Sequence, residues 1–317
     1  MRVSEQRSRF DRLFRLSVGA TLALTLSACD GQIGAEGSAR EGQTPSDGGF
    51  TARAVTSGPA VGRRLTREEL VNSIEVVLGV DLDPETYGLP IDSRVPEGFR
   101  NSAQDLLLSP ARTRAYASMA EAAVAQSDFS SFVATHAECT DMRAECIASF
   151  VARAGAFLLR APVPDTERQL YENLFAIAAD EGDGFETGAT LVVRAMLQSP
   201  RFLYRLESQS GSGSTRTVDS YELATRLSFL VWNAAPDEVL VDLAERGELA
   251  NDLETQVERL LNHPRARRAF RQYLEQGLYL DAIPESFALG ADMKEETYRL
   301  FERVVWDEEG DFMQGFN

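Results

Sequence analysis

The chain has 317 residues and a formal net charge of −17, from 32 basic and 49 acidic side chains. Binding to a nucleic-acid backbone depends on an excess of cationic side chains, so this charge argues against nucleic acid as a partner. With only three cysteines and two histidines, few metal or nucleophilic sites can be built from these residue types.

Residues 1–28 have the composition of an export signal. Several arginines precede the apolar run LSVGATLALTLSA, which is shorter than the roughly 20 apolar residues that a spanning helix needs. The tetrad Leu26-Ser27-Ala28-Cys29 resembles a bacterial lipobox, in which the cysteine is lipidated. An ordinary cleaved signal with a chance cysteine is the alternative. We expect export and a lipid anchor at Cys29, which would hold the protein on the bacterial cell envelope, in the periplasm or at the outer membrane.

Residues 29–61 are rich in glycine, serine and alanine. A segment of this composition buries too little apolar surface to offset the entropy of ordering. The sequence therefore predicts a disordered tether between the lipid anchor and a globular body.

From residue 62 onward, apolar residues recur at helical spacing. Thr66 and Glu69 have capping-box spacing at the start of the first helix, and Gly79 is its stop signal. The next helix should begin at Ser109-Pro110. Further helices are expected over 141–159, 165–179, 185–198, 217–232, 236–247, 252–263, 265–280 and 292–313. No segment alternates long enough to predict a strand, so the predicted fold is all-α.

Breaks in this pattern divide the body into three helical modules. They cover residues 62–135, 136–207 and 217–317. The run SQSGSGSTR, at 208–216, has the composition of a flexible linker.

The stretch SPRFLYRLE, at 199–207, has the pattern of a short core-facing helix. Ser199 is the candidate N-cap and Pro200 suits the first helical position. Phe202, Leu203 and Leu206 would then share one buried face. The two arginines of this stretch are four residues apart, so they repel each other and need acceptors elsewhere.

Arginines recur just after three predicted helix starts, in SPARTR, SPRFLYR and HPRARR. Arg112, Arg201, Arg205, Arg265 and Arg267 are therefore candidates for a shared anion site. Such a site would take a carboxylate, a phosphate or a haem propionate. Pairing of these arginines with acidic helices of the same chain is the alternative.

His136, Cys139 and Cys146 form an H-x-x-C-x6-C set. A soft metal could use these ligands, but an oxidising compartment favours a disulfide between the cysteines. Within one continuous helix their Cα atoms would lie about 10 Å apart, beyond the approximately 7 Å that a disulfide allows. The bond therefore requires a chain break, and Thr140 or Asp141 is the predicted N-cap that provides it.

Other polar features have simpler interpretations. The acidic clusters at 180–186 and 307–311 lack calcium-loop spacing and are expected to be solvated. His263, before Pro264, is expected to cap a helix end. The sequence assigns no metal, no cofactor and no catalytic residue.

Four ordered passages, at 63–81, 188–207, 221–249 and 257–280, carry a family resemblance. They are similar to the large multi-module secreted proteins of unknown function from planctomycetes and myxobacteria, which are often associated with c-type cytochrome domains. The resemblance implies a c-type cytochrome or another envelope protein as partner. It also implies a chain truncated at its C-terminus, whose last helix would expose apolar side chains: Tyr298, Leu300, Phe301, Val304, Val305 and Phe312.

Together these observations predict a lipid-anchored helical module that binds or scaffolds in a cytochrome-linked or polymer-handling surface system. The alternative is an extracellular enzyme, either an oxidoreductase served by a separate cytochrome or a hydrolase acting on polysaccharides. An enzyme should have a concave pocket with convergent titratable groups. A scaffold should instead expose an apolar patch or a charged face.

Overall fold

The computed structural model describes residues 62–95, 98–103, 105–206, 218–284 and 286–307. Regular structure in these ranges consists of twelve α-helices, a few short helical turns and one pair of two-residue strands, which confirms the all-α prediction. The predicted lipidation residue Cys29 and the tether lie outside the described residues. No helix within the described ranges is both long and apolar enough to cross a membrane.

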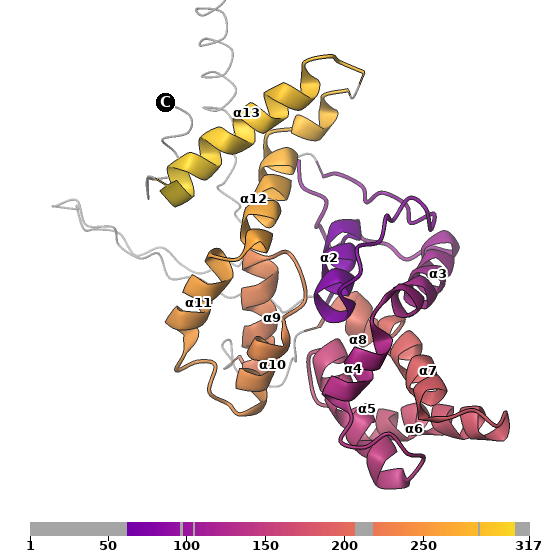
Figure 1. The fold of residues 1–317 in the computed structure, drawn as a ribbon. Helices are drawn as coiled ribbons and strands as arrows, with labels where there is room; N and C mark the ends of the chain where they lie inside the picture. Colours follow the sequence, from indigo (N-terminus) through magenta and orange to yellow (C-terminus); the bar gives the residue numbers. More distant parts are fainter. Residues whose placement is uncertain (1–61, 96–97, 104, 207–217, 285, 308–317) are drawn as a thin grey trace, which may run out of the picture. The chain divides into compact units, whose positions relative to one another are not determined.

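The elements up to residue 206 form the first group in Figure 1. They are β1 (Arg63–Arg64), α2 (Arg67–Leu78), α3 (Pro110–Gln126), α4 (Phe129–His136), α5 (Ala144–Leu159), α6 (Asp165–Asp180), α7 (Phe185–Leu197), α8 (Pro200–Leu203) and β2 (Tyr204–Arg205). Phe150, Phe175 and Phe202 are fully buried in the core that most of these helices share.

The second group follows residue 217. It comprises α9 (Ser220–Val231), α10 (Glu238–Glu245), α11 (Leu253–Leu261), α12 (Pro264–Gly277), η2 (Leu280–Ala282), α13 (Gly290–Glu302) and η3 (Arg303–Asp307). Its core surrounds Trp232, Leu240 and Leu260. The indole Nε1 of Trp232 donates to the carbonyl oxygen of Leu260 at 2.9 Å, so this buried ring has its polar group satisfied.

Helix boundaries follow their local signals where these are strong. Thr66 and Glu69 make the predicted capping box of α2, and Gly79 ends the helix at φ 70°. Ser109 caps α3 through its hydroxyl, which accepts from the N–H of Arg112. The cap at His263 lies at a helix start, because its ring Nδ1 accepts from the N–H of Arg265 at the beginning of α12.

Two boundaries differ from the prediction. Helix α4 was not predicted, because its eight residues carry two serines and a threonine and are too few for a clear apolar period. Helix α5 begins at Ala144, with Arg143 as its N-cap residue. Neither Thr140 nor Asp141 is the cap, and the chain stays irregular for several residues after Cys139.

The helix predicted at 199–207 is much shorter than expected. Ser199 does cap it, yet α8 ends at Leu203 and Tyr204 continues as strand β2. The reason is a competing partner: β2 pairs antiparallel with β1, Arg64 opposite Tyr204, and the N–H of Leu65 donates to the carbonyl of Leu203 at 2.8 Å. Leu206 is consequently 53% exposed, not part of the buried face.

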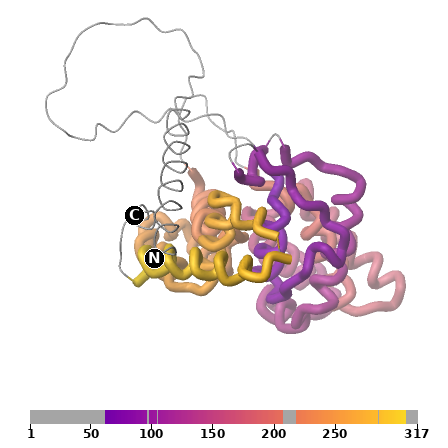
Figure 2. The backbone as a smooth tube through the Cα atoms, turned by 90° about the horizontal axis from the view of Figure 1, so that it is seen from above, coloured from indigo at the N-terminus to yellow at the C-terminus, as the bar shows by residue number. Residues whose placement is uncertain are grey.

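The last helix buries part of the surface that was expected to be exposed. Figure 2 shows yellow α13 beside the orange helices, and it packs on α12. Phe301 and Val304 are buried, whereas Leu300 is 40% exposed. The prediction of exposed apolar side chains is therefore wrong for Phe301 and Val304. Phe312 lies outside the described residues.

Candidate functional site

All five candidate anion-binding arginines have an acid within 4 Å, and three of them lie at separate places. On α3, Arg112 Nη2 lies 2.9 Å from Asp92 Oδ1. Arg265 lies 3.4 Å from Glu75, and Arg267 lies 3.6 Å from Asp307.

The pairing of Arg112 belongs to a buried structural cluster. Asp92 also accepts from Arg64 Nη2 at 2.5 Å and from the backbone N–H of Arg67 at 2.6 Å, and its side chain is fully buried. Both carboxylate oxygens are used, which offsets the cost of burying this charge. Asp92 thereby ties the irregular segment after α2 to the start of that helix.

The other two candidates, Arg201 and Arg205, line one cavity of about 250 Å³ together with Arg160 and Arg226. Arg201 comes from α8, Arg205 from β2 and Arg226 from α9, while Arg160 directly follows α5. Tyr204 and Tyr221 also line this cavity. We call this the arginine cavity.

Arg160 is the most buried arginine that lines the arginine cavity. It ends α5 in the left-handed conformation, at φ 57°, and is 6% exposed. Its Nη2 donates to the carbonyl oxygens of Arg201, Phe202 and Tyr204 at 2.8, 3.0 and 2.9 Å. Its Nη1 is also buried but has no hydrogen-bond partner among the described residues.

Burial lowers the pKa of the Arg160 guanidinium to about 10. The positive charge of Arg205 and, less strongly, that of Arg201 contribute to this lowering, while Glu69 opposes it. The group is still protonated at neutral pH. The arginine cavity therefore holds a desolvated cation that its arginine neighbours destabilise, and a bound anion would relieve this.

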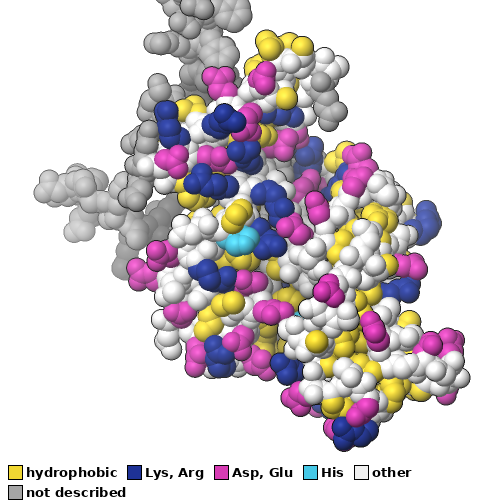
Figure 3. Space-filling view, viewed as in Figure 1, with side chains coloured by type: hydrophobic (Ala, Val, Ile, Leu, Met, Phe, Trp, Pro, Cys, Tyr) yellow, Lys and Arg dark blue, Asp and Glu magenta, His cyan; other side chains and the backbone are white. Residues whose placement is uncertain are grey.

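The acidic side chains near the arginine cavity have other partners. Glu69, 3.9 Å from Arg205, accepts two hydrogen bonds from Arg63, at 2.8 and 2.6 Å, and one from the N–H of Thr66. Asp219 and Glu222 line the cavity but form the capping box of α9. Four arginines and two carboxylates line the cavity, and Arg201 and Arg205 each have a further acid nearby, Glu167 at 3.7 Å and Glu69 at 3.9 Å. Elsewhere, acidic and basic side chains are interspersed over the face in Figure 3.

The sequence interpretation missed Arg160 and Arg226. Each stands alone in an apolar helical stretch, FLLRAP and LATRLSF, so neither belongs to an arginine-rich helix start. A signal was nevertheless present: Arg160 follows a run of fully apolar positions, and a cation there must either reach solvent or find buried acceptors.

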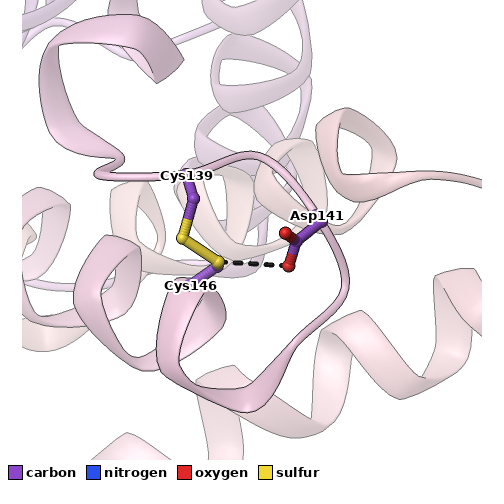
Figure 4. Close-up of side chains that lie close together, drawn as sticks. All are labelled: Cys139, Asp141 and Cys146. Carbon is purple, nitrogen blue, oxygen red and sulfur yellow. Dashed lines mark hydrogen bonds between the residues drawn. A yellow bond between two sulfur atoms is a disulfide. The ribbon is translucent and has the colours of Figure 1, made fainter.

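The two cysteines of the H-x-x-C-x6-C set are joined. Figure 4 shows the Cys139–Cys146 disulfide, with Cα atoms 5.2 Å apart. Asp141 Oδ1 lies 3.1 Å from Cys146 Sγ. A disulfide sulfur carries no proton, so this is a polar contact. It becomes a hydrogen bond only when the thiol is restored.

His136 does not belong to the group of possible ligand atoms around the disulfide. The atoms close enough to share an ion belong to Cys139, Asp141 and Cys146. The ring of His136 stacks on Phe132 and Phe157, at centroid distances of 4.3 and 5.1 Å, and its Nδ1 is 2.9 Å from the carbonyl of Phe132. The ligand set considered for a soft metal is not assembled, because two of its members form a disulfide and the third packs among aromatic rings.

Three family models match the chain in consecutive order. PSD3, described as a protein of unknown function (DUF1587), matches residues 63–128. PSD5 (DUF1595) matches 146–207 and PSD4 (DUF1592) matches 218–317, with the same description. No curated protein and no solved structure matches. The chain therefore contains three consecutive domains of unknown function, in keeping with the multi-module proteins that it resembles.

Proposed function

We propose that this protein is a lipid-anchored binding module of the cell envelope, whose arginine cavity holds the anionic group of an organic ligand. The observation that carries the proposal is Arg160: a buried guanidinium that lines the cavity and has an unpartnered Nη1. An unsatisfied charged donor is costly in a protein interior. A carboxylate oxygen in the cavity would satisfy it, and Arg201 is close enough to influence the same charge.

The position of the arginine cavity supports a binding role. Arg160, Arg201 and Arg205 lie in the PSD5 match and Arg226 in the PSD4 match, while Glu69, from the PSD3 match, contacts Arg205. Ligand sites are common where domains meet, because each contributes wall residues without disturbing its own core.

The test is anion binding by the purified chain, measured by calorimetry with acetate, succinate and inorganic phosphate. Arg201→Gln should weaken binding by tenfold or more while leaving the fold intact, because this side chain is 26% exposed. Arg160→Gln should abolish binding, although the loss of its carbonyl contacts also threatens folding. Arg246→Gln is the matched control, since Arg246 is exposed and pairs with Asp242 and Glu248. Equal anion affinity in the wild type and the Arg201 variant would refute the proposal.

Export and anchoring are tested separately at Cys29. Cys29→Ser should release the protein from the membrane fraction, and the wild type should carry lipid mass. A variant that stays membrane-bound, together with a wild type of unlipidated mass, would exclude the anchor. A c-type cytochrome remains the partner that the family resemblance suggests, and a haem propionate has the carboxylate chemistry that the arginine cavity suits.

A second candidate function, hydrolysis, rests on a different cavity of about 450 Å³, lined by Glu68 and Asp281 among others. Burial raises the pKa of Glu68, whereas Arg94 and Arg100 lower the pKa of Asp281 against the effect of its own burial. Two carboxyl groups shifted in opposite directions are the pattern of an acid and base pair. Glu68→Gln should then abolish hydrolysis of a polysaccharide panel without changing anion affinity at the arginine cavity.

A further inference from the structure

The arginine cavity continues into a larger groove. A groove of about 940 Å³, within the size range of ligand sites, shares Arg205 and Arg226 with the cavity. Phe229 lies at the junction: the guanidinium carbons of Arg160 and Arg205 lie 5.7 and 4.9 Å from its ring centroid. A molecule bound to the arginines at this end could extend into the groove.

The groove wall is largely apolar. Phe99, Tyr273, Phe270 and Trp306 form a continuous aromatic row along it, with successive ring centroids 5.5, 6.4 and 5.1 Å apart. Leu230, on α9, is 82% exposed in the same groove, and Leu261, on α11, is 42% exposed. Covering these side chains would be favourable, because burial of apolar surface contributes about 25 cal/mol per Å².

Two glutamines of the groove have their side-chain carbonyl oxygens already engaged. Gln272 Oε1 accepts from the side-chain amides of Asn72 and Asn233, at 3.2 and 3.1 Å. Gln276 Oε1 accepts from the N–H of Arg100 at 3.1 Å. A sugar chain brings many hydroxyl groups that need partners, so these contacts favour an apolar occupant over a polysaccharide.

We infer that the ligand is an amphipathic carboxylate, with its head in the arginine cavity and an alkyl or aryl body in the groove between α9, α12 and η3. The inference rests on the proposed anion binding and adds the class of ligand. Charge complementarity favours an anionic head: the guanidinium of Arg160 lines the cavity, and its buried Nη1 has no hydrogen-bond partner among the described residues, which suits a single carboxylate. The aromatic row and the exposed leucines favour an alkyl or aryl body.

The test is a chain-length series. Butanoate, hexanoate, octanoate and decanoate are titrated into the full chain carrying Cys29→Ser, without detergent. Binding is followed by calorimetry and by tryptophan fluorescence, to which Trp306 in the groove contributes. Affinity should rise about two- to fourfold per methylene. Octanol, which has the same body without the charge, should bind at least tenfold more weakly than octanoate, and octyl phosphate shows whether a phosphate head is preferred.

Substitutions in the groove test binding of the apolar body separately from binding of the anionic head. Leu230→Gln with Leu261→Gln should flatten the chain-length series without changing acetate affinity, while Leu170→Gln, at a 65% exposed leucine of α6, should leave the series unchanged. If the affinity of the wild type does not change with chain length while acetate still binds, the proposal of an amphipathic ligand is refuted and the anion site is retained. Absence of binding by every carboxylate would overturn both. Tighter binding of octyl phosphate than of octanoate would overturn the carboxylate head.

Discussion

The hydroxyl of Ser73 accepts a hydrogen bond from the backbone N–H of Ala235 at 2.9 Å, across 162 positions of sequence. Ser73 also donates to the carbonyl of Glu69 at 2.6 Å and is fully buried. One side chain thus links helix α2 of the PSD3 match to the turn after α9 in the PSD4 match.

Ser73→Ala should therefore lower the free energy of unfolding by about 1 to 3 kcal/mol, because the N–H of Ala235 is left buried without its partner. Chemical denaturation measures this change. Ser130→Ala removes the same atom from an exposed serine, whose hydroxyl contacts Asp128 at 3.2 Å, and should change stability by less than about 0.5 kcal/mol. Equal effects of the two variants would contradict a linking role for Ser73.

Phe202→Ala should lower the free energy of unfolding by roughly 3 to 5 kcal/mol, because the ring is fully buried and its removal leaves a cavity. Leu206→Ala, four residues on at a 53% exposed site, is the control and should cost much less. Arg201→Ala should also cost much less than Phe202→Ala, since its pair with Glu167 spans 3.7 Å and is partly exposed. The reverse ranking in denaturation curves would make this stretch a recognition surface in place of a core element.

The Cys139–Cys146 disulfide closes a short loop, so its loss should cost only about 2 kcal/mol. The double variant Cys139→Ala, Cys146→Ala should show this decrease in denaturation curves, and a reductant should shift the wild-type curve to that of the variant. The variant itself should not respond to the reductant. Intact-mass analysis after alkylation provides the direct check: two alkylated thiols without prior reduction would exclude the bond.

His136 should titrate below its ordinary pKa of 6.5, mainly because burial disfavours the charged imidazole. The neutral ring stabilises the fold above about pH 6.5, and this contribution is lost as the pH falls through 6.5 towards the folded pKa. Two histidines give two resolvable imidazole signals by NMR, and His263→Gln identifies the one from His136.

Substitution of Glu238 gives a more specific test of the pKa of His136. Its carboxylate lies 4.0 Å from His136 Nε2 and raises the pKa of the imidazole against the effect of burial. Glu238→Gln should lower that pKa further, while Glu254→Gln at an exposed site should not change it. An unchanged titration in the Glu238 variant would show that the pair does not interact in solution.

The sequence predicted the elements whose signals are local. The capping box at Thr66 and the cap at Ser109 fix helix starts through contacts within three residues, so the pattern alone identified them. Strand β2 was missed because its partner, Arg63–Arg64, lies about 140 positions earlier. Local propensity at 199–207 favours a helix, and a distant strand overrides it.

The site was predicted only in part, for a similar reason. Arg201 and Arg205 stood out by their place near a helix start, but proximity along the chain says nothing about which other cations they meet. Arg160 and Arg226 reach the same cavity from two matched domains through tertiary packing. Arg112, Arg265 and Arg267 share the local pattern but lie at separate places, each beside its own acid.

The arginine cavity draws its wall from two domains and its nearest buried counter-charge, Glu69, from a third. Recombination that moved any one of these domains into another protein would break the site. We therefore expect the three to be inherited as a block, in this order, and the residues at their junction to change together during divergence.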